Sequence, residues 1–166
     1  MEKDNPKVCI TGISGYLGSW VLKKFMDCQD PQFDIRGTVR DPSNKEKIQP
    51  LQESLGEEFD NVELVAADLT DAASVDKAIE GCDYVIHTAS PFPSQQPKNE
   101  NDLIRPAVEG TKAVLDACKK HAVKKLVVTS SVAAIIDYSK YVEGKVLTEE
   151  DWLEDYGTFW VFIILS

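Results

Sequence analysis

The sequence contains few of the residues that build metal sites or disulfide frameworks. Its 166 residues include only two histidines, His87 and His121, and four cysteines that lie far apart and form no CxxC motif. Two histidines offer too few ligands for a zinc site, and scattered cysteines are typical of reduced, buried thiols in a cytosolic protein. We therefore predict no metal site and a cytoplasmic location.

Long apolar runs and a positive net charge are also absent. No apolar run approaches the ~20 residues that a membrane-spanning helix needs, and the charged N-terminal sequence MEKDNPK carries no signal peptide. The 28 acidic residues outnumber the 18 basic ones, which gives a net charge of −10. This charge disfavours nucleic acid or an anionic membrane as a partner. The oligomeric state stays open.

Short apolar segments, typical of buried strands, alternate with helical patterns. The expected strands are residues 7–11, 34–39, 62–66, 84–87 and 126–129, and the expected helices are residues 16–28, 42–55, 72–81 and 102–121. Asp41 followed by Pro42, and Asp71, are the expected helix caps, and Gly81 is an expected helix end. The pattern indicates an α/β protein with a parallel sheet covered on both faces. We predict a Rossmann-like, doubly wound sheet of strand order 3-2-1-4-5 in one domain, residues 1–155.

The segment 7–18 (KVCITGISGYLG) is the most informative part of the chain. A short apolar strand is followed by Gly12, Gly15 and Gly18 and then by a helical pattern. Gly12 would let the chain turn sharply, Gly15 would let the backbone approach phosphates, and Gly18 would let the helix pack on the strand. The free N–H groups and the positive dipole end of the helix favour a pyrophosphate there. The alternative is an ordinary strand-to-helix turn with incidental glycines.

Arg40 stands 22 residues beyond Gly18, where NAD-binding folds usually place an acid. A guanidinium there offers a planar fork to a 2′-phosphate, and no carboxylate repels that phosphate. The residue pattern therefore predicts NADP(H) rather than NAD(H). The alternative is an ordinary surface arginine at a strand end.

Six motifs occur in an order and spacing that resemble a known family. They are TGISGYLGSW, RGTVRDP, ADLTD, DYVIHTASP, PAVEGTKAVLDAC and LVVTSS, and the similarity covers about residues 6–155. The chain resembles the extended short-chain dehydrogenases/reductases of the NAD-dependent epimerase/dehydratase superfamily. Its motifs are most similar to the branch of dihydroflavonol 4-reductase and cinnamoyl-CoA reductase.

The resemblance implies a set of cofactor-binding positions. These positions are Thr11, Gly12, Gly15, Tyr16, Leu17 and Gly18 at the phosphates, Arg40 and Lys47 at the 2′-phosphate, Asp68 and Leu69 at the adenine, Thr88, Ala89 and Ser90 beside the ribose and nicotinamide, and Thr129 and Ser130 after the fifth strand. Ser131 matches the catalytic serine, with Ser130 as the second choice. Asp68 could instead be a cap-like loop residue, Lys47 a solvated helix lysine, and the two serines ordinary polar residues at a strand end.

The resemblance also implies the chemistry, which is hydride transfer between nicotinamide C4 and the carbon of a carbonyl or alcohol substrate. In the family a tyrosine supplies the proton, and a lysine four residues later lowers the pKa of that tyrosine. The chain holds one literal match, Tyr141 and Lys145, only ten residues after Ser131. That spacing is shorter than the family's, so this pair is a weak candidate.

The tail differs from the family. Residues 159–165 (FWVFIIL) are seven consecutive apolar residues, too few to span a bilayer. We expect residues 156–166 to be an atypical tail, the last sheet strands and the substrate domain to be absent, and the chain to be a truncated oxidoreductase with little activity. The alternative is a non-catalytic NADP-binding module or redox sensor. The identity of the substrate stays open.

Overall fold

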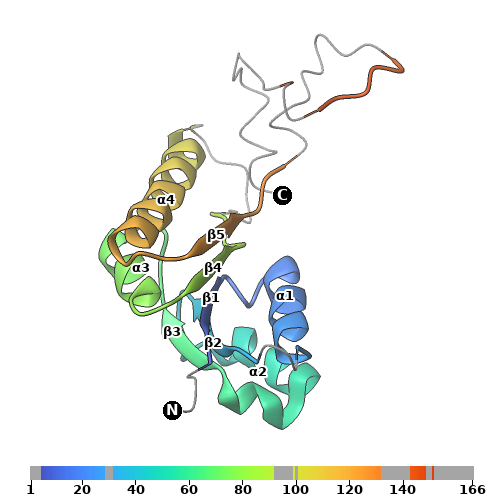
Figure 1. Ribbon diagram of the computed structural model, residues 1–166, viewed down its shortest axis with the longest axis vertical. Helices are drawn as coiled ribbons and strands as arrows, with labels where there is room; N and C mark the ends of the chain where they lie inside the picture. Colours follow the sequence, from blue (N-terminus) through green and yellow to red (C-terminus); the bar gives the residue numbers. More distant parts are fainter. Residues whose placement is uncertain are drawn as a thin grey trace.

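The computed structural model describes residues 5–28, 32–91, 99, 101–131, 143–148 and 151. In this part of the chain five parallel strands form one sheet in the order β3-β2-β1-β4-β5 (Figure 1). The strands are β1 (Lys7–Thr11), β2 (Asp34–Val39), β3 (Glu63–Ala66), β4 (Tyr84–His87) and β5 (Lys125–Val128). The predicted α/β class, parallel sheet and strand order are confirmed.

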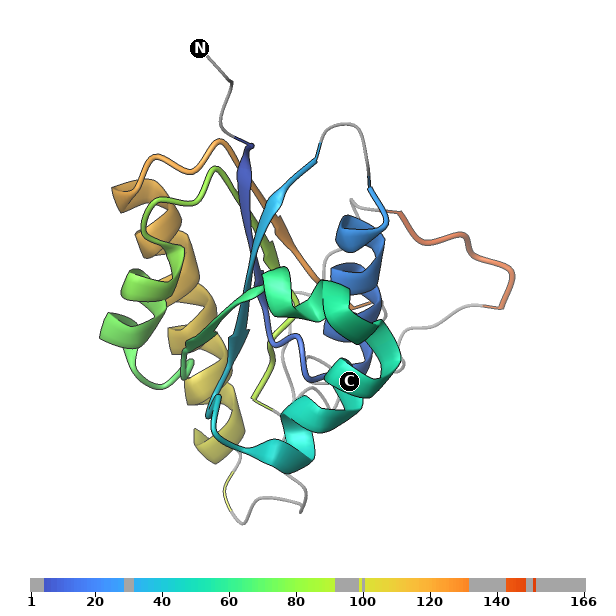
Figure 2. The same cartoon turned by 90° about the horizontal axis from the view of Figure 1, so that it is seen from below.

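Helices cover both faces of the sheet. They are α1 (Tyr16–Met26), α2 (Lys45–Leu55), the 3-10 helix η1 (Gly56–Asn61), α3 (Ala72–Ile79) and α4 (Asn101–Lys120). Figure 2 shows α1 and α2 on one side of the sheet and α3 and α4 on the other. Because every strand pair is parallel, the carboxyl ends of the strands all lie at the same edge, where α/β proteins bind their ligands.

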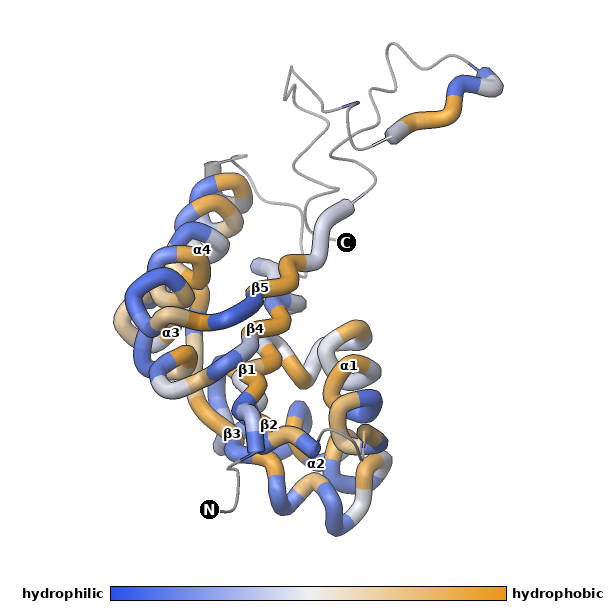
Figure 3. Tube along the Cα trace, viewed as in Figure 1, coloured by the Kyte–Doolittle hydropathy of each residue, from blue (hydrophilic) through white to orange (hydrophobic). Residues whose placement is uncertain are grey.

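The core has one half on each face of the sheet, and β1 contributes to both. Val8 and Ile10 pack towards α1 and α2, while Cys9 between them packs towards α3 and α4; all three side chains are fully buried. This alternation follows from the two-residue period of a strand. Stretches of β1, β4 and β5 are correspondingly hydrophobic in Figure 3, whereas hydrophobic and hydrophilic residues alternate along the helices.

The start of α2 differs from the prediction. Asp41 and Pro42 do not begin a helix, because the Asp41 carboxylate accepts hydrogen bonds from the Ser43 N–H (2.8 Å) and hydroxyl (2.6 Å) and closes a local turn. The helix begins at Lys45, after Asn44. The prediction at Asp41 was therefore wrong by one turn, and the 3-10 helix that follows α2 was not predicted at all.

The prediction for α3 is confirmed. The Asp71 side chain accepts a hydrogen bond from the Ala73 N–H at 3.0 Å, as an N-cap residue does. Gly81, with φ +74°, lies just beyond the end of this helix in the left-handed conformation that glycine adopts without strain. No helix in the described residues is both long and apolar enough to cross a membrane. The tail 156–166 lies outside the described residues.

The two aspartates allow a matched test of helix capping. We expect Asp71→Ala to lower the free energy of unfolding by about 1 kcal/mol, because it removes a cap hydrogen bond from α3. Asp41→Ala removes a turn contact from an exposed loop and should cost less. Urea denaturation of the full chain measures both losses, and equal losses would contradict the assigned roles.

Candidate functional site

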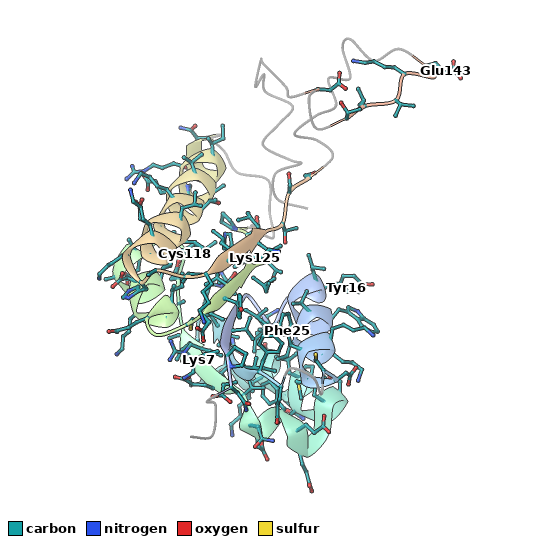
Figure 4. All side chains as sticks on the ribbon, in the orientation of Figure 1. Lys7, Tyr16, Phe25, Cys118, Lys125 and Glu143 are labelled. Carbon is teal, nitrogen blue, oxygen red and sulfur yellow. The ribbon has the colours of Figure 1, made fainter. Side chains whose placement is uncertain are left out.

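A cavity of about 910 Å³ lies at the carboxyl edge of the sheet, and its wall includes residues of β1, β2, β4 and β5 and of the segment that follows β3. The residues predicted to bind the cofactor all line it, together with Ser131; they are Thr11, Gly12, Gly15, Tyr16, Leu17, Gly18, Arg40, Lys47, Asp68, Leu69, Thr88, Ala89, Ser90, Thr129 and Ser130. The fold therefore brings six separate sequence motifs around one space. Tyr16 stands at the start of α1 (Figure 4) and is 84% exposed.

The glycine turn leaves no room for side chains at two of its three positions. Gly12 has φ +72°, and a Cβ atom there would lie 2.9 Å from the Ala89 Cα. A Cβ atom at Gly18 would lie 2.3 Å from the Gly12 carbonyl oxygen. Gly15 is less restricted, with 3.3 Å to the same oxygen. The close contacts hold the first turn of α1 against the end of β1, and residues 15–18 of this turn line the cavity.

The turn is also fixed by hydrogen bonds that it donates to β2. The Gly12 N–H donates to both the backbone oxygen and the hydroxyl of Thr38, each at 3.1 Å, and the Ile13 N–H donates to the same backbone oxygen at 3.1 Å. Thr38 was not singled out from the sequence. Its only sequence signal is a hydroxyl residue near the carboxyl end of a strand, a part of β2 that is buried.

Thr11 joins β1 to the segment after β4. Its hydroxyl oxygen lies 2.8 Å from the His87 Nδ1 and accepts the N–H groups of Thr88 and Ala89, each at 3.1 Å. His87 is 3% exposed and lines the cavity. Sequence reasoning missed this histidine as a site residue, although a polar residue ending a buried strand at the carboxyl edge was an available signal.

Charged groups line the cavity beyond the ends of β2 and β3. Arg40 and Lys47 are exposed and line the wall with Asp68. The Asp68 carboxylate accepts the Thr70 hydroxyl (2.7 Å) and N–H (2.8 Å), and these bonds lower the pKa of Asp68, as does the nearby Arg40 to a smaller extent. Asp68 is therefore an anion at neutral pH that lies beside a guanidinium.

The third part of the wall follows β5. Thr129 donates its N–H (3.0 Å) and hydroxyl (3.1 Å) to the His87 carbonyl oxygen. Ser130, which is exposed, and Ser131, which is partly buried, follow it along the cavity. Contacts between the end of β4 and Thr129 thus fix the start of the segment that carries the predicted catalytic serine.

The weak candidate pair is not brought to this cavity by any described contact. Lys145 forms an exposed ion pair with Asp151, with 2.5 Å between Nζ and Oδ1. It is not among the residues that line the cavity, and its neighbour Glu143 stands well away from the sheet in Figure 4. Tyr141 lies outside the described residues.

The buried histidine gives the protein a pH dependence. Burial lowers the pKa of His87 below its ordinary 6.5. Below about pH 6.5 the unfolded chain takes up a proton that the folded chain refuses. We therefore expect the free energy of unfolding to fall as the pH drops from about 6.5 towards the folded pKa. Urea denaturation between about pH 5 and pH 8 measures it, with His87→Asn as the control that lacks this group. If the free energy of unfolding changed with pH in the same way in both proteins, the prediction would be contradicted.

Comparison with known proteins identifies the family. The 3-beta hydroxysteroid dehydrogenase/isomerase family matches residues 9–157. The chain is 40% identical over 136 residues to tetraketide alpha-pyrone reductase 1 of Arabidopsis thaliana, and this match covers 81% of this chain and 40% of the relative. It is 37% identical over 154 residues to dihydroflavonol 4-reductase of Gerbera hybrida, and this match covers 92% of this chain and 40% of that protein. The chain spans about two fifths of the length of these relatives.

A solved structure agrees with the sequence matches. The crystal structure of yeast methylglyoxal/isovaleraldehyde reductase Gre2 complexed with NADPH superposes with a TM-score of 0.74 at 27% identity, and the match covers 92% of this chain and 45% of Gre2. The resemblance to the dihydroflavonol 4-reductase branch is confirmed by the relatives. Because the family match extends over most of the sequence, the chain belongs to the 3-beta hydroxysteroid dehydrogenase/isomerase family.

Proposed function

We propose that this chain is the NADP(H)-binding part of an oxidoreductase that transfers hydride between nicotinamide C4 and the carbon of a carbonyl or alcohol. The observation that carries the proposal is the shared cavity, which joins a glycine turn, two cationic side chains and a Thr-Ser-Ser segment. Solved and curated relatives include reductases, and the yeast Gre2 structure is a complex with NADPH.

The residues present fit a dinucleotide phosphate. The cavity of about 910 Å³ lies over the glycine turn, where a Cβ at Gly12 or Gly18 would meet backbone atoms. Arg40 follows the end of β2 with Lys47 near it, and together they offer a planar fork and an ammonium to a 2′-phosphate. Asp68, held as an anion by Thr70, is the proposed acceptor for the amino group of an adenine.

The chemistry assigned to the serine end is polarisation of the substrate. The bound nicotinamide supplies or accepts the hydride. The Ser131 hydroxyl is proposed to donate to the substrate oxygen and to stabilise the charge that develops there. Ser130, the neighbouring hydroxyl, is the second choice for this role.

A catalytic assignment also needs a group that donates a proton to the substrate oxygen. Among the described residues that line the cavity, Tyr16 and Lys47 are the only tyrosine and lysine, and they do not form a Tyr-x-x-x-Lys pair. We therefore propose little turnover by the 166-residue chain. The same observation favours a second candidate, a non-catalytic NADP-binding module that reports the redox state of the cofactor.

Arg40 provides the test of the cofactor. We expect the chain to bind NADPH more tightly than NADH, and Arg40→Ala to weaken NADPH binding by roughly 10- to 150-fold, the worth of about 1.5–3 kcal/mol for a charge-assisted hydrogen bond. NADH binding should change little. Isothermal titration measures both affinities.

Arg105→Ala is the matched control, because Arg105 is an exposed arginine paired with Glu109 on α4. It removes the same charge from the surface and should leave both affinities unchanged. Equal affinity of the wild-type chain for NADPH and NADH would contradict the assignment of the 2′-phosphate to Arg40.

Turnover separates the two candidate functions. We expect purified protein to oxidise NADPH with aromatic or aliphatic aldehydes only very slowly, because the described residues of the cavity wall include no Tyr-x-x-x-Lys pair. The decrease in absorbance of NADPH measures the rate. Rapid turnover that is lost in Tyr141→Phe would show instead that Tyr141 and Lys145 form the catalytic pair.

A further inference from the structure

His87 is a buried polar residue that lines the cavity, and its role is not fixed by the cofactor assignment. It ends β4, its side chain is 3% exposed, and its register partners are Thr11 on β1 and Val128 on β5. The histidine therefore lies where the carboxyl ends of three adjacent strands meet. Its hydrogen bonds decide how those three ends are held together.

The protons around Thr11 can be counted. A hydroxyl has one hydrogen and two acceptor lone pairs. The Thr11 oxygen accepts the N–H groups of Thr88 and Ala89, each at 3.1 Å, which uses both lone pairs. Its one hydrogen must then be donated to the His87 Nδ1, 2.8 Å away. Nδ1 is therefore bare, and the single proton of the neutral ring is on Nε2.

The surroundings keep the ring neutral. Burial lowers the pKa of His87, and no charged side chain contributes to that shift. Arg40, Lys47 and Asp68 are the charged groups among the described residues of the cavity wall, and the cause of the lowered pKa of His87 is burial. A second proton on the ring would have to sit on Nδ1 and would displace the Thr11 hydrogen.

The main chain of His87 completes the connection. Its carbonyl oxygen accepts both the N–H and the hydroxyl of Thr129, at 3.0 and 3.1 Å. The side chain thus joins β4 to β1, and the carbonyl joins β4 to the segment that carries Ser131. The contact between Ala89 and Gly12, where a Cβ on the glycine would lie 2.9 Å from the Ala89 Cα, shows that the joined segments touch.

We infer that His87 is a positioning residue which acts as a neutral hydrogen-bond acceptor and sets the spacing between the glycine turn and the segment of Thr88 and Ala89. The inference rests on the proposed NADP(H) site. A dinucleotide is held at both ends, so its affinity depends on the distance between the segments that hold it. A half-ligand held only at the adenine end does not depend on that distance.

The first measurement needs no cofactor. Long-range ¹⁵N–¹H NMR spectra of the full chain at pH 7 report which ring nitrogen carries the proton. The chain has two histidines, so His121→Gln assigns the signals. We expect His87 to be neutral and protonated on Nε2. A proton on Nδ1, or a charged ring, would overturn the inference whether or not NADPH binds.

The second measurement compares affinities for NADPH and for 2′,5′-ADP, which lacks the nicotinamide end. His87→Leu removes the acceptor and should weaken NADPH binding about tenfold or more, because it leaves a buried hydroxyl hydrogen unpaired. The affinity for 2′,5′-ADP should stay the same. His87→Asn places an oxygen near the position of Nδ1 and should keep NADPH affinity within about threefold of the wild type.

Thr11 supplies a second pair of variants in case His87→Leu does not fold. Thr11→Val should reproduce the selective loss of NADPH affinity, because the hydroxyl that it removes is engaged by His87, Thr88 and Ala89. Thr11→Ser, which keeps the hydroxyl, should not. A folded His87→Leu or Thr11→Val protein with wild-type NADPH affinity, or with equal losses for both ligands, would overturn the inference. Wild-type protein that binds neither ligand would contradict the proposed function itself.

Discussion

The carbonyl oxygen of Gly12 is the point on which the site depends. A Cβ atom at Gly18 would come within 2.3 Å of it and one at Gly15 within 3.3 Å, so α1 approaches β1 more closely than any side chain at Gly18 would allow. That approach turns the first N–H groups of α1 towards the strand ends and leaves the cavity open above them. Thr38 then holds the turn from β2, and Ala89 holds it from the segment after β4. Replacing this contact with a side chain would move the helix and close the space for a pyrophosphate.

Most of the fold could be predicted because its signals are local. Alternating apolar strands and helices, together with Asp71 as a cap, gave the class, strand order and most element boundaries, and the structure confirms them. The start of α2 could not be obtained in this way. Asp41 and Pro42 satisfy the usual pattern of a helix start, but Ser43 offers the Asp41 carboxylate two nearer donors, and the turn they form delays the helix to Lys45. Two local patterns competed there, and the sequence alone does not show which is stronger.

The candidate site could be predicted in part for a related reason. Arg40 was found because it stands where NAD-binding folds usually place an acid, and Ser131 was found through the resemblance of the segment LVVTSS to the family. Thr38 and His87 were missed because their roles depend on contacts across strands. The bond between Thr11 and His87 joins residues 76 positions apart, and it requires the register that pairs β1 with β4. Register is a property of the assembled sheet, so no pattern within either strand reveals the bond.

The described cavity wall is locally positive, although the whole protein is negative, and both can hold because salt screens distant charges. The chain carries a net charge of −10, yet the proposed ligand is a polyanion. Within the described cavity wall, the cations Arg40 and Lys47 outnumber the single anion Asp68. Salt screens exposed charges beyond about 8 Å at physiological ionic strength, so most surface carboxylates act weakly on a ligand in the cavity, whereas Arg40 and Lys47 act at contact. The acidic surface therefore slows the approach of an anionic cofactor more than it weakens the final complex. Raising the salt concentration would reduce both the repulsion on approach and the attraction at Arg40.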